Sequence, residues 1–176
     1  ALYAGGNFST AGGIACSSIA RWNGSAWSPL GTGTNLGTYA LVDYDDGTGN
    51  ALYAGGIFTL AGGVASARIA KWNGSAWNAL GAGLNGNCWA LTTFDDGSGL
   101  KLYAGGAFTV AGGGNASRIA RWNGTLWSNL PGGGGSNGVD NAVYALGSFN
   151  DNNQPQLYAG GDFLNAGGVA AARIAK

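Results

Sequence analysis

Short apolar segments alternate with turn-forming residues along the whole chain, and none of them shows helical periodicity. In residues 38–50 an apolar run ends at an Asp-Gly turn, and residues 51–58 begin a second apolar run directly after it. Asp-Gly and Gly-Xaa pairs supply the positive φ angles that tight connections between strands need. This pattern predicts a β-hairpin over residues 38–58.

Two further strands are predicted after this hairpin and a loop. In residues 68–74 Ile69 and Lys71 fall on one face of an extended segment, while Ala70 and Trp72 fall on the other. An Asn-Gly pair follows at positions 73 and 74, and it favours a two-residue turn into a fourth strand over residues 75–81. The pattern therefore predicts four antiparallel strands in a meander.

This four-strand pattern recurs along the chain. Tyr3, Tyr53, Tyr103 and Tyr158 align with one another, and a loop at 131–142 accounts for the longer last step. Four-stranded units at such a period are typical of β-propeller blades, and one such sheet buries both apolar faces only between neighbouring blades. We therefore predict an all-β chain, a β-propeller of four-stranded antiparallel blades.

The predicted blades are unequal at the two ends of the chain. We expect a partial blade over 1–31, full blades over 37–81 and 87–131, and a partial blade over 142–176, with three, four, four and three strands. Since these strands do not form whole four-stranded blades, we expect part of a larger ring of about six to eight blades, or a ring completed by other chains.

The repeated motif combines an apolar strand, a double glycine and two tryptophans. It resembles the kelch motif, although tryptophan stands where kelch repeats usually carry tyrosine and the GGxFxxAGG loop is not standard for kelch. The chain is more similar to the LYAGGxFxxAGG…IAxWNGxxWxxLG repeats of secreted bacterial proteins and fungal cell-polarity markers. This resemblance implies a propeller and leaves the function open, because propellers host many unrelated roles. The motif residues are Gly5, Gly6, Trp22, Trp27, Gly55, Gly56, Trp72, Trp77, Gly105, Gly106, Trp122, Trp127, Gly160 and Gly161.

Charge and hydropathy argue against two classes of partner. Only 9% of the residues are charged, and the eight basic side chains equal the eight acidic ones in number. A nucleic-acid or anionic-lipid surface needs a concentration of positive charge. No run of about 18 apolar residues and no recognisable signal peptide occurs. We therefore expect neither nucleic-acid binding nor membrane insertion.

Residue types that enzymes commonly use are missing. The 176 residues include no histidine, methionine or glutamate. No imidazole is present to serve a serine nucleophile, a general base or a zinc site, and a catalytic aspartate pair would have to be assembled from different blades. We expect a protein that is not an enzyme and that uses no cofactor.

Acidic turns are the candidate metal site. Asp43, Asp45 and Asp46, and again Asp95 and Asp96, resemble part of a calcium-binding loop. Calcium takes six to eight oxygen ligands, including a late acidic one, and the chain has Asn50 and Leu100 at that place. A hairpin turn with solvated aspartates is favoured over a calcium site.

Aromatic side chains are the candidate ligand platforms. The recurring tryptophans are able to stack against sugars, but filling the space between blades is the favoured interpretation. Trp89 has Tyr39 and Tyr144 as its counterparts, near the start of the first strand of each blade. These three residues are the ligand-binding candidates at the mouth of the expected channel.

Basic side chains recur at two places in the repeat. They suggest either a positive ring for an acidic ligand or pairing with the aspartates, and pairing is favoured. The residues are Arg21, Lys71, Arg121 and Lys176, with Arg68, Arg118 and Arg173 three positions earlier in their blades.

The sequence leaves two covalent modifications undecided, a disulfide bond and N-glycosylation. Cys16 and Cys88 occupy non-equivalent places, so free thiols are favoured over a disulfide. Five Asn-Xaa-Ser/Thr triplets permit N-glycosylation without requiring it, since three coincide with the Asn-Gly turn. They begin at Asn7, Asn23, Asn73, Asn115 and Asn123.

These features predict a binding, adhesion or assembly module located outside the cell or at its surface. Its expected partners are a protein ligand, a glycan ligand or copies of itself, and equivalent blades would let weak contacts add up. A multivalent lectin is one alternative. A structural subunit of a ring or filament is another, because incomplete blades expose strand edges.

Overall fold

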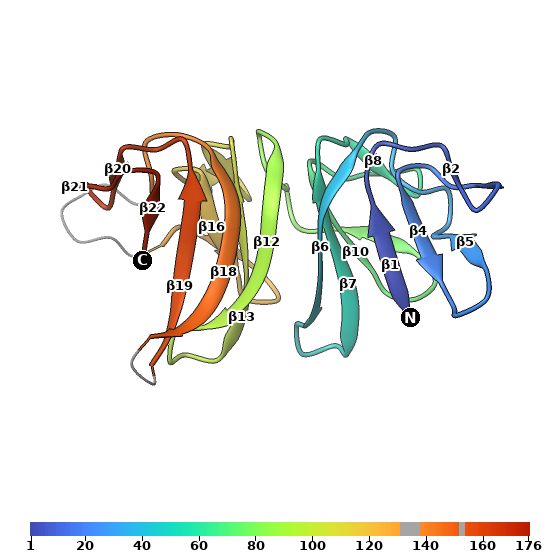
Figure 1. Ribbon diagram of the computed structural model, residues 1–176, viewed down its shortest axis with the longest axis horizontal. Coiled ribbons are helices and arrows are strands. Elements are labelled where there is room, and N and C mark those ends of the chain that lie inside the picture. Colours follow the sequence, from blue (N-terminus) through green and yellow to red (C-terminus); the bar gives the residue numbers. More distant parts are fainter. Residues whose placement is uncertain (131–137, 152–153) are drawn as a thin grey trace.

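The computed structural model describes residues 1–130, 138–151 and 154–176, and these residues form strands and connecting loops without a helix (Figure 1). The prediction of an all-β chain is confirmed. Most of the loop expected at 131–142 lies outside the described residues.

The second unit contains a complete four-stranded antiparallel sheet. In spatial order its strands are β6 (Thr38–Asp45), β7 (Asn50–Gly56), β10 (Ile69–Trp72) and β11 (Trp77–Ala79). Each strand pairs with the following strand of the same sheet, as in a meander. The predicted hairpin of β6 and β7 is confirmed, and so are the two strands predicted after it, which are β10 and β11.

The third unit repeats this sheet, and the corresponding sheets of the two end units have three strands each. The third sheet consists of β12 (Cys88–Asp95), β13 (Leu100–Gly106), β16 (Ile119–Trp122) and β17 (Trp127–Ser128). Both four-stranded sheets carry a bulge near the start of their first strand, between Thr38 and Ala40 in β6.

The first sheet has only the second, third and fourth strands of the repeat. These are β1 (Leu2–Gly5), β4 (Ile19–Trp22) and β5 (Trp27–Pro29). β1 pairs with β4 on one side, and no strand of the described residues pairs with its other side.

The fourth sheet has the first three strands of the repeat instead. They are β18 (Val143–Asp151), β19 (Gln154–Gly161) and β22 (Ile174–Ala175). The strand numbers of the four sheets are thus three, four, four and three, as expected from the sequence.

Each repeat also contains a two-stranded hairpin where the sequence indicated only a loop. The predicted loop at 59–67 contains β8 (Leu60–Ala61) and β9 (Val64–Ala65), joined by Gly62 and Gly63, which both have positive φ. A Cβ atom on Gly62 would lie 2.7 Å from Trp77, so this turn packs directly on the tryptophan. The equivalent hairpins are β2 (Thr10–Ala11) with β3 (Ile14–Ala15), β14 (Val110–Ala111) with β15 (Gly114–Asn115), and β20 (Asn165–Ala166) with β21 (Val169–Ala170).

The double glycine has a packing cause. A Cβ atom on Gly55 would lie 2.6 Å from the sulfur of Cys88, which is on the first strand of the next unit. A Cβ atom on Gly56 would collide with the carbonyl oxygen of Gly37. Only glycine, which has no Cβ atom, lets this strand lie so close to the Cys88 side chain and to the Gly37 backbone.

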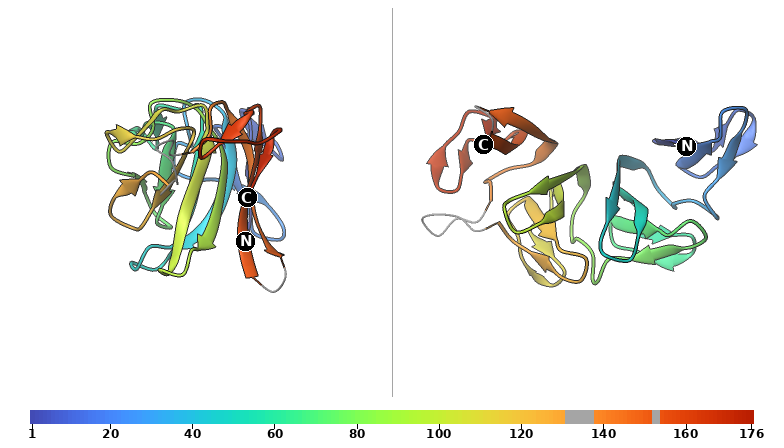
Figure 2. Two further views of the ribbon diagram at one scale, coloured as in Figure 1. Left: turned by 90° about the vertical axis from the view of Figure 1, so that its left-hand side faces the viewer. Right: turned by 90° about the horizontal axis from the view of Figure 1, so that it is seen from below.

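The four sheets follow one another in an open arc, with β6, β12 and β18 on its inner side (Figure 2). β12 contacts β6 on one side and β18 on the other. The sheets of the described residues form no closed ring.

The core lies between neighbouring sheets. One cluster includes Ile19 and Leu30 of the first unit with Phe58 and Trp77 of the second. A larger cluster joins the second and third units, and a smaller one lies in the fourth. Trp77 Nε1 also donates to the carbonyl oxygen of Leu30 at 2.8 Å, so this tryptophan stabilises the contact between units.

Candidate functional site

Asp46 is the centre of a polar network across three strands of the second sheet. Its Oδ2 accepts hydrogen bonds from the hydroxyl of Tyr53 on β7 at 2.7 Å and from Nζ of Lys71 on β10 at 2.6 Å. Its Oδ1 accepts from the amide and hydroxyl of Thr48, at 3.1 and 2.6 Å. Because β6, β7 and β10 are neighbours, residues that are distant in sequence meet at one carboxylate.

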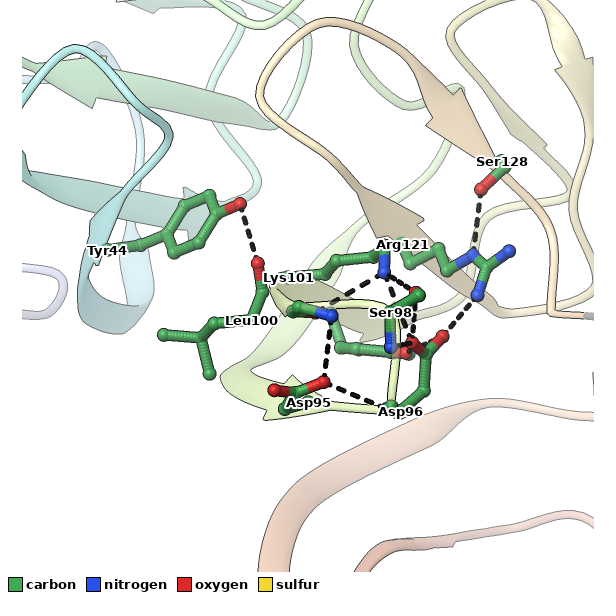
Figure 3. Close-up of polar contacts among 11 residues, drawn as sticks. Tyr44, Asp95, Asp96, Ser98, Leu100, Lys101, Arg121 and Ser128 are labelled. Atoms are coloured by element: carbon green, nitrogen blue, oxygen red, sulfur yellow. Dashed lines mark hydrogen bonds and ion pairs between the residues drawn. The ribbon is translucent and has the colours of Figure 1, made fainter.

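The same network recurs in the third unit, which Figure 3 shows in close-up. Asp96 accepts from the Tyr103 hydroxyl at 3.2 Å and from Lys101 Nζ at 3.1 Å, and it also pairs with Arg121. The hydroxyl of Ser98 takes the place of Thr48.

The fourth unit contains equivalent contacts, in which Asp151 accepts hydrogen bonds from the Tyr158 hydroxyl at 3.3 Å and from Lys176 Nζ at 3.1 Å. The favoured expectation that basic side chains pair with aspartates therefore holds for Lys71, Arg121 and Lys176.

These contacts keep the carboxylates ionised. Burial by itself would raise the pKa of Asp46, but the hydrogen bonds from Lys71, Thr48 and Tyr53 outweigh it and hold this pKa well below the usual range. The hydroxyl of Ser98 and the ammonium of Lys101 likewise lower the pKa of Asp96. Burial and the neighbouring carboxylate raise the pKa of Tyr53, so its hydroxyl remains a donor.

Four of the five calcium candidates have structural partners instead. Asp45 Oδ1 accepts from the amides of Gly47 and Gly49 at 2.8 and 2.9 Å, and Asp95 holds the equivalent turn of the third unit in the same way. Asp43 is exposed, and Asp46 and Asp96 are bonded to cationic side chains. Among the described residues, no three His, Cys, Asp or Glu side chains are grouped so that they could hold a metal ion.

Two of the three ligand-binding candidates lie side by side. Tyr39 on β6 and Trp89 on β12 have ring centroids 5.2 Å apart and planes tilted by 47°. Tyr39 is 43% exposed, and Tyr144 on β18 is 52% exposed. Trp89 and Tyr144 occupy the places equivalent to Tyr39 on the next two inner strands, and we call these three residues the aromatic row (Tyr39, Trp89 and Tyr144).

An ion pair lies at the Tyr144 end of the aromatic row. The hydroxyl of Tyr144 donates to Asp162 at 2.9 Å, and Arg173 donates to the other oxygen of the same carboxylate at 2.8 Å. An exposed aromatic ring beside a charged pair offers both apolar contact and hydrogen bonding to a ligand.

The recurring tryptophans are mainly buried or half-buried and pack inside the protein. In each of the first three units the two tryptophans of the third and fourth strands have ring centroids 5.4 Å apart. Trp77 and Trp122 are buried, and the others are half-buried.

Cys16 and Cys88 are free and buried. Burial raises the pKa of Cys88 to about 12. A thiol in such surroundings is a poor nucleophile and a poor metal ligand.

The asparagines of the Asn-Gly turns also have structural roles. Asn73 Oδ1 accepts from the amides of Ser75 and Ala76 at 3.0 and 2.9 Å, and Asn23 makes the same contacts in the first unit. The asparagines of the three Asn-Gly turns are all exposed, namely Asn23, Asn73 and Asn123.

One further recurring contact was not predicted from the sequence. Asn35 Oδ1 accepts from the amides of Thr59 and Leu60, both at 2.9 Å, and so fixes the segment that leads into β6. Asn85 and Asp140 do the same in the following units. Their recurrence in register with the repeat was the available signal.

No family model, curated protein or solved structure matches this chain. Within the part of the chain that the structure describes, no helix is long and apolar enough to cross a membrane.

Proposed function

We propose that this chain forms part of a kelch-like β-propeller outside the cell or at its surface and works as a non-catalytic module for binding, adhesion or assembly. Repeated antiparallel sheets that pack face to face in an arc support the propeller (Figure 2). The resemblance of the motif to kelch-like repeats of secreted proteins supports the location.

The aromatic row is the observation that carries the binding role. Tyr39, Trp89 and Tyr144 occupy equivalent places on three consecutive inner strands, and two of them are well exposed. Exposed aromatic side chains commonly provide the central contacts of binding surfaces. Equivalent weak contacts on successive units would add up when the ligand itself is repetitive.

A comparison of variants on printed arrays tests this role. The chain would be applied to an array of glycans and to an array of extracellular-matrix proteins, next to a Tyr39→Ala, Trp89→Ala double variant. We expect the double variant to lose affinity by about tenfold or more, because it removes two adjacent anchors. Leu126→Ala removes an exposed apolar side chain outside the aromatic row and should bind as the unchanged chain does. Equal binding by all three proteins would contradict the role of the aromatic row.

The lectin alternative rests on the Tyr39–Trp89 pair, whose tilted rings suit the apolar face of a sugar. Signals confined to the glycan array would favour it.

The structural alternative rests on the strand edge of β1 that no described strand covers. Light scattering that shows a discrete multimer of the 17.5 kDa chain would favour this alternative.

A further inference from the structure

Three arginines recur at one place in the repeat, and all of them have a left-handed backbone. Arg68, Arg118 and Arg173 have φ angles of 68°, 66° and 68°. Glycine adopts this backbone far more readily than a residue with a side chain, and such strain is found most often at functional sites. The recurrence of arginine at a place that suits glycine directs attention to the guanidinium groups.

The arginine of the fourth unit holds a carboxylate. Arg173 Nη1 donates to Asp162 Oδ1 at 2.8 Å, and the hydroxyl of Tyr144 donates to Oδ2 of the same side chain at 2.9 Å. An arginine and a residue of the aromatic row thus bind one carboxylate between them. The chain fills this carboxylate site with its own side chain.

The third unit has the same backbone frame around Arg118. The amide of Gly106 donates to the carbonyl oxygen of Arg118 at 2.9 Å, and the amide of Arg118 donates to that of Phe108 at 3.0 Å. The amide of Ala107 donates to the carbonyl oxygen of Asn87 at 2.9 Å. The equivalent residues of the fourth unit form the same three bonds, at 3.0, 3.0 and 2.9 Å. The two units therefore hold their aromatic residue, their arginine and the residue after the double glycine at equivalent backbone positions.

The third unit lacks the carboxylate. Ala107 stands where the fourth unit has Asp162, and Trp89 stands where it has Tyr144. Ala107 is exposed, and Trp89 and Arg118 are half-buried. The side chain of Arg118 forms no hydrogen bond or ion pair with another described residue. The third unit thus keeps the aromatic ring and the guanidinium group without the acidic partner.

The arginine of the second unit is occupied in another way. Arg68 Nη1 donates to the backbone carbonyl oxygens of Ile57 and Phe58 at 2.6 and 3.3 Å. The second unit still adds an aromatic ring to the place described in the third, because Tyr39 lies beside Trp89. Described units flank the third unit on both sides, since β12 contacts both β6 and β18 (Figure 2).

We propose that Trp89 and Arg118 form a binding site for a sugar that carries a carboxylate, such as a uronic acid. The apolar face of the sugar packs on Trp89 beside Tyr39, and its carboxylate accepts hydrogen bonds from the guanidinium group of Arg118. A uronic acid is favoured over an acidic peptide because its carboxylate is attached to the ring that stacks, so one rigid unit makes both contacts. This inference rests on the proposed binding role of the aromatic row and names the ligand class.

The test compares two synthetic polymers that carry either glucuronic acid or glucose, which differ in the carboxylate at C6. Surface plasmon resonance with the 176-residue chain should show about tenfold or tighter binding to the glucuronic acid polymer, since hydrogen bonds between charged groups are strong. Arg118→Gln should lower this affinity to that for the glucose polymer. Arg21→Ala removes a positive charge outside the aromatic row and should leave the preference unchanged.

Ala107→Asp provides a second variant, which supplies the third unit with the carboxylate that the fourth unit already has. The new side chain should pair with Arg118 and repel the ligand, so the preference for glucuronic acid should be lost. Ala107→Asn has nearly the same shape without the charge and should keep most of the preference. Since residue 107 is exposed, neither substitution disturbs the core.

Equal binding of the two polymers, or a preference that Ala107→Asp leaves unchanged, would overturn the proposed site. A third polymer that carries N-acetylaspartate tests the sugar, and binding as tight as that of glucuronic acid would overturn the assignment to a sugar. The binding role of the aromatic row is judged separately by the Tyr39→Ala, Trp89→Ala double variant on the arrays. That role stands if array binding depends on these two residues while the preference for glucuronic acid is absent.

Discussion

Residues 1–6 and 51–56 have the same sequence, ALYAGG, and lie in two different environments. In β7 this sequence pairs with β6 on one side and β10 on the other, while β4 is the only described strand that pairs with β1. Leu52 is 9% exposed and Leu2 is 62% exposed. Tyr53 is fully buried, whereas Tyr3 is half-buried.

The difference comes from neighbours and not from local sequence. β6 covers the edge of β7, and its turn supplies Asp46 to the Tyr53 hydroxyl. In a repeat protein, the burial of one unit depends on the units and strands beside it. The two copies of ALYAGG therefore offer matched positions at which this dependence can be measured.

The largest difference is expected at the repeated tyrosine. Tyr53→Ala should lower the free energy of unfolding by about 3–5 kcal/mol, since it leaves a cavity in the core between the second and third units. Tyr3→Ala should cost about 1 kcal/mol or less because this ring is already partly hydrated. Urea unfolding followed by tryptophan fluorescence measures both, and equal losses would contradict the comparison.

Asp46→Asn should cost roughly 2 kcal/mol at about pH 7, since it weakens charged hydrogen bonds to Lys71 and Tyr53. The pKa of Asp46 is lower in the folded chain than in the unfolded chain, so the unfolded chain takes up the proton first as the pH falls. The stabilisation is thus fully present above about pH 4 and decreases progressively as the pH falls from there toward the lower pKa of the folded chain. Unfolding would be measured at about pH 7 and about pH 3 for the unchanged chain and for Asp46→Asn. The difference in their free energies of unfolding should be smaller at the lower pH, and a difference independent of pH would exclude this cause.

Tyr44→Phe removes one hydroxyl and leaves the packing of the ring between the second and third units. The free energy of unfolding should fall by about 1 kcal/mol, which is the usual contribution of a hydrogen bond such as that from Tyr44 to the Leu100 carbonyl oxygen. Tyr39→Phe on the same strand is the control and should be neutral. Thermal unfolding of the two variants makes the comparison, and a neutral Tyr44→Phe would mean that this bond does not stabilise the contact.

The smallest difference is expected at the repeated arginine. Arg121→Ala breaks the pair with Asp96 and should cost up to about 1 kcal/mol, because both side chains are partly hydrated. Arg21→Ala should change the stability of the isolated chain by less than about 0.5 kcal/mol. Added salt should reduce the Arg121 effect. An equal or larger effect of Arg21→Ala would contradict the expectation that Arg21, which has no ion-pair partner among the described residues, contributes less than Arg121.

The strands were predictable because their signals are local. The Asp-Gly turn after β6 and the Asn-Gly turn after β10 need the backbone angles that these residues supply, and alternation marks the strands between them. The number of strands in each sheet followed from aligning the repeated tyrosines together with the strand order that the resemblance to kelch blades implies.

The short hairpins and the polar networks were not predictable in the same way. β8 and β9 contain two residues each, too few for any periodicity, and they depend on packing of their turn against Trp77. Asp46 and Lys71 are 25 positions apart and meet only because β6, β7 and β10 lie side by side. The contact of Tyr39 with Trp89 depends on the packing of one unit against the next.

Hydrogen exchange of the two ALYAGG copies tests the dependence on neighbours most directly. Since their sequences are identical, their intrinsic exchange rates are nearly equal, and differences report structure. Amides of residues 51–56 should exchange slowly, at rates set by large-scale unfolding, whereas alternate amides of residues 1–6 should exchange far faster because no described strand covers that edge. Equal protection of the two copies would contradict the account.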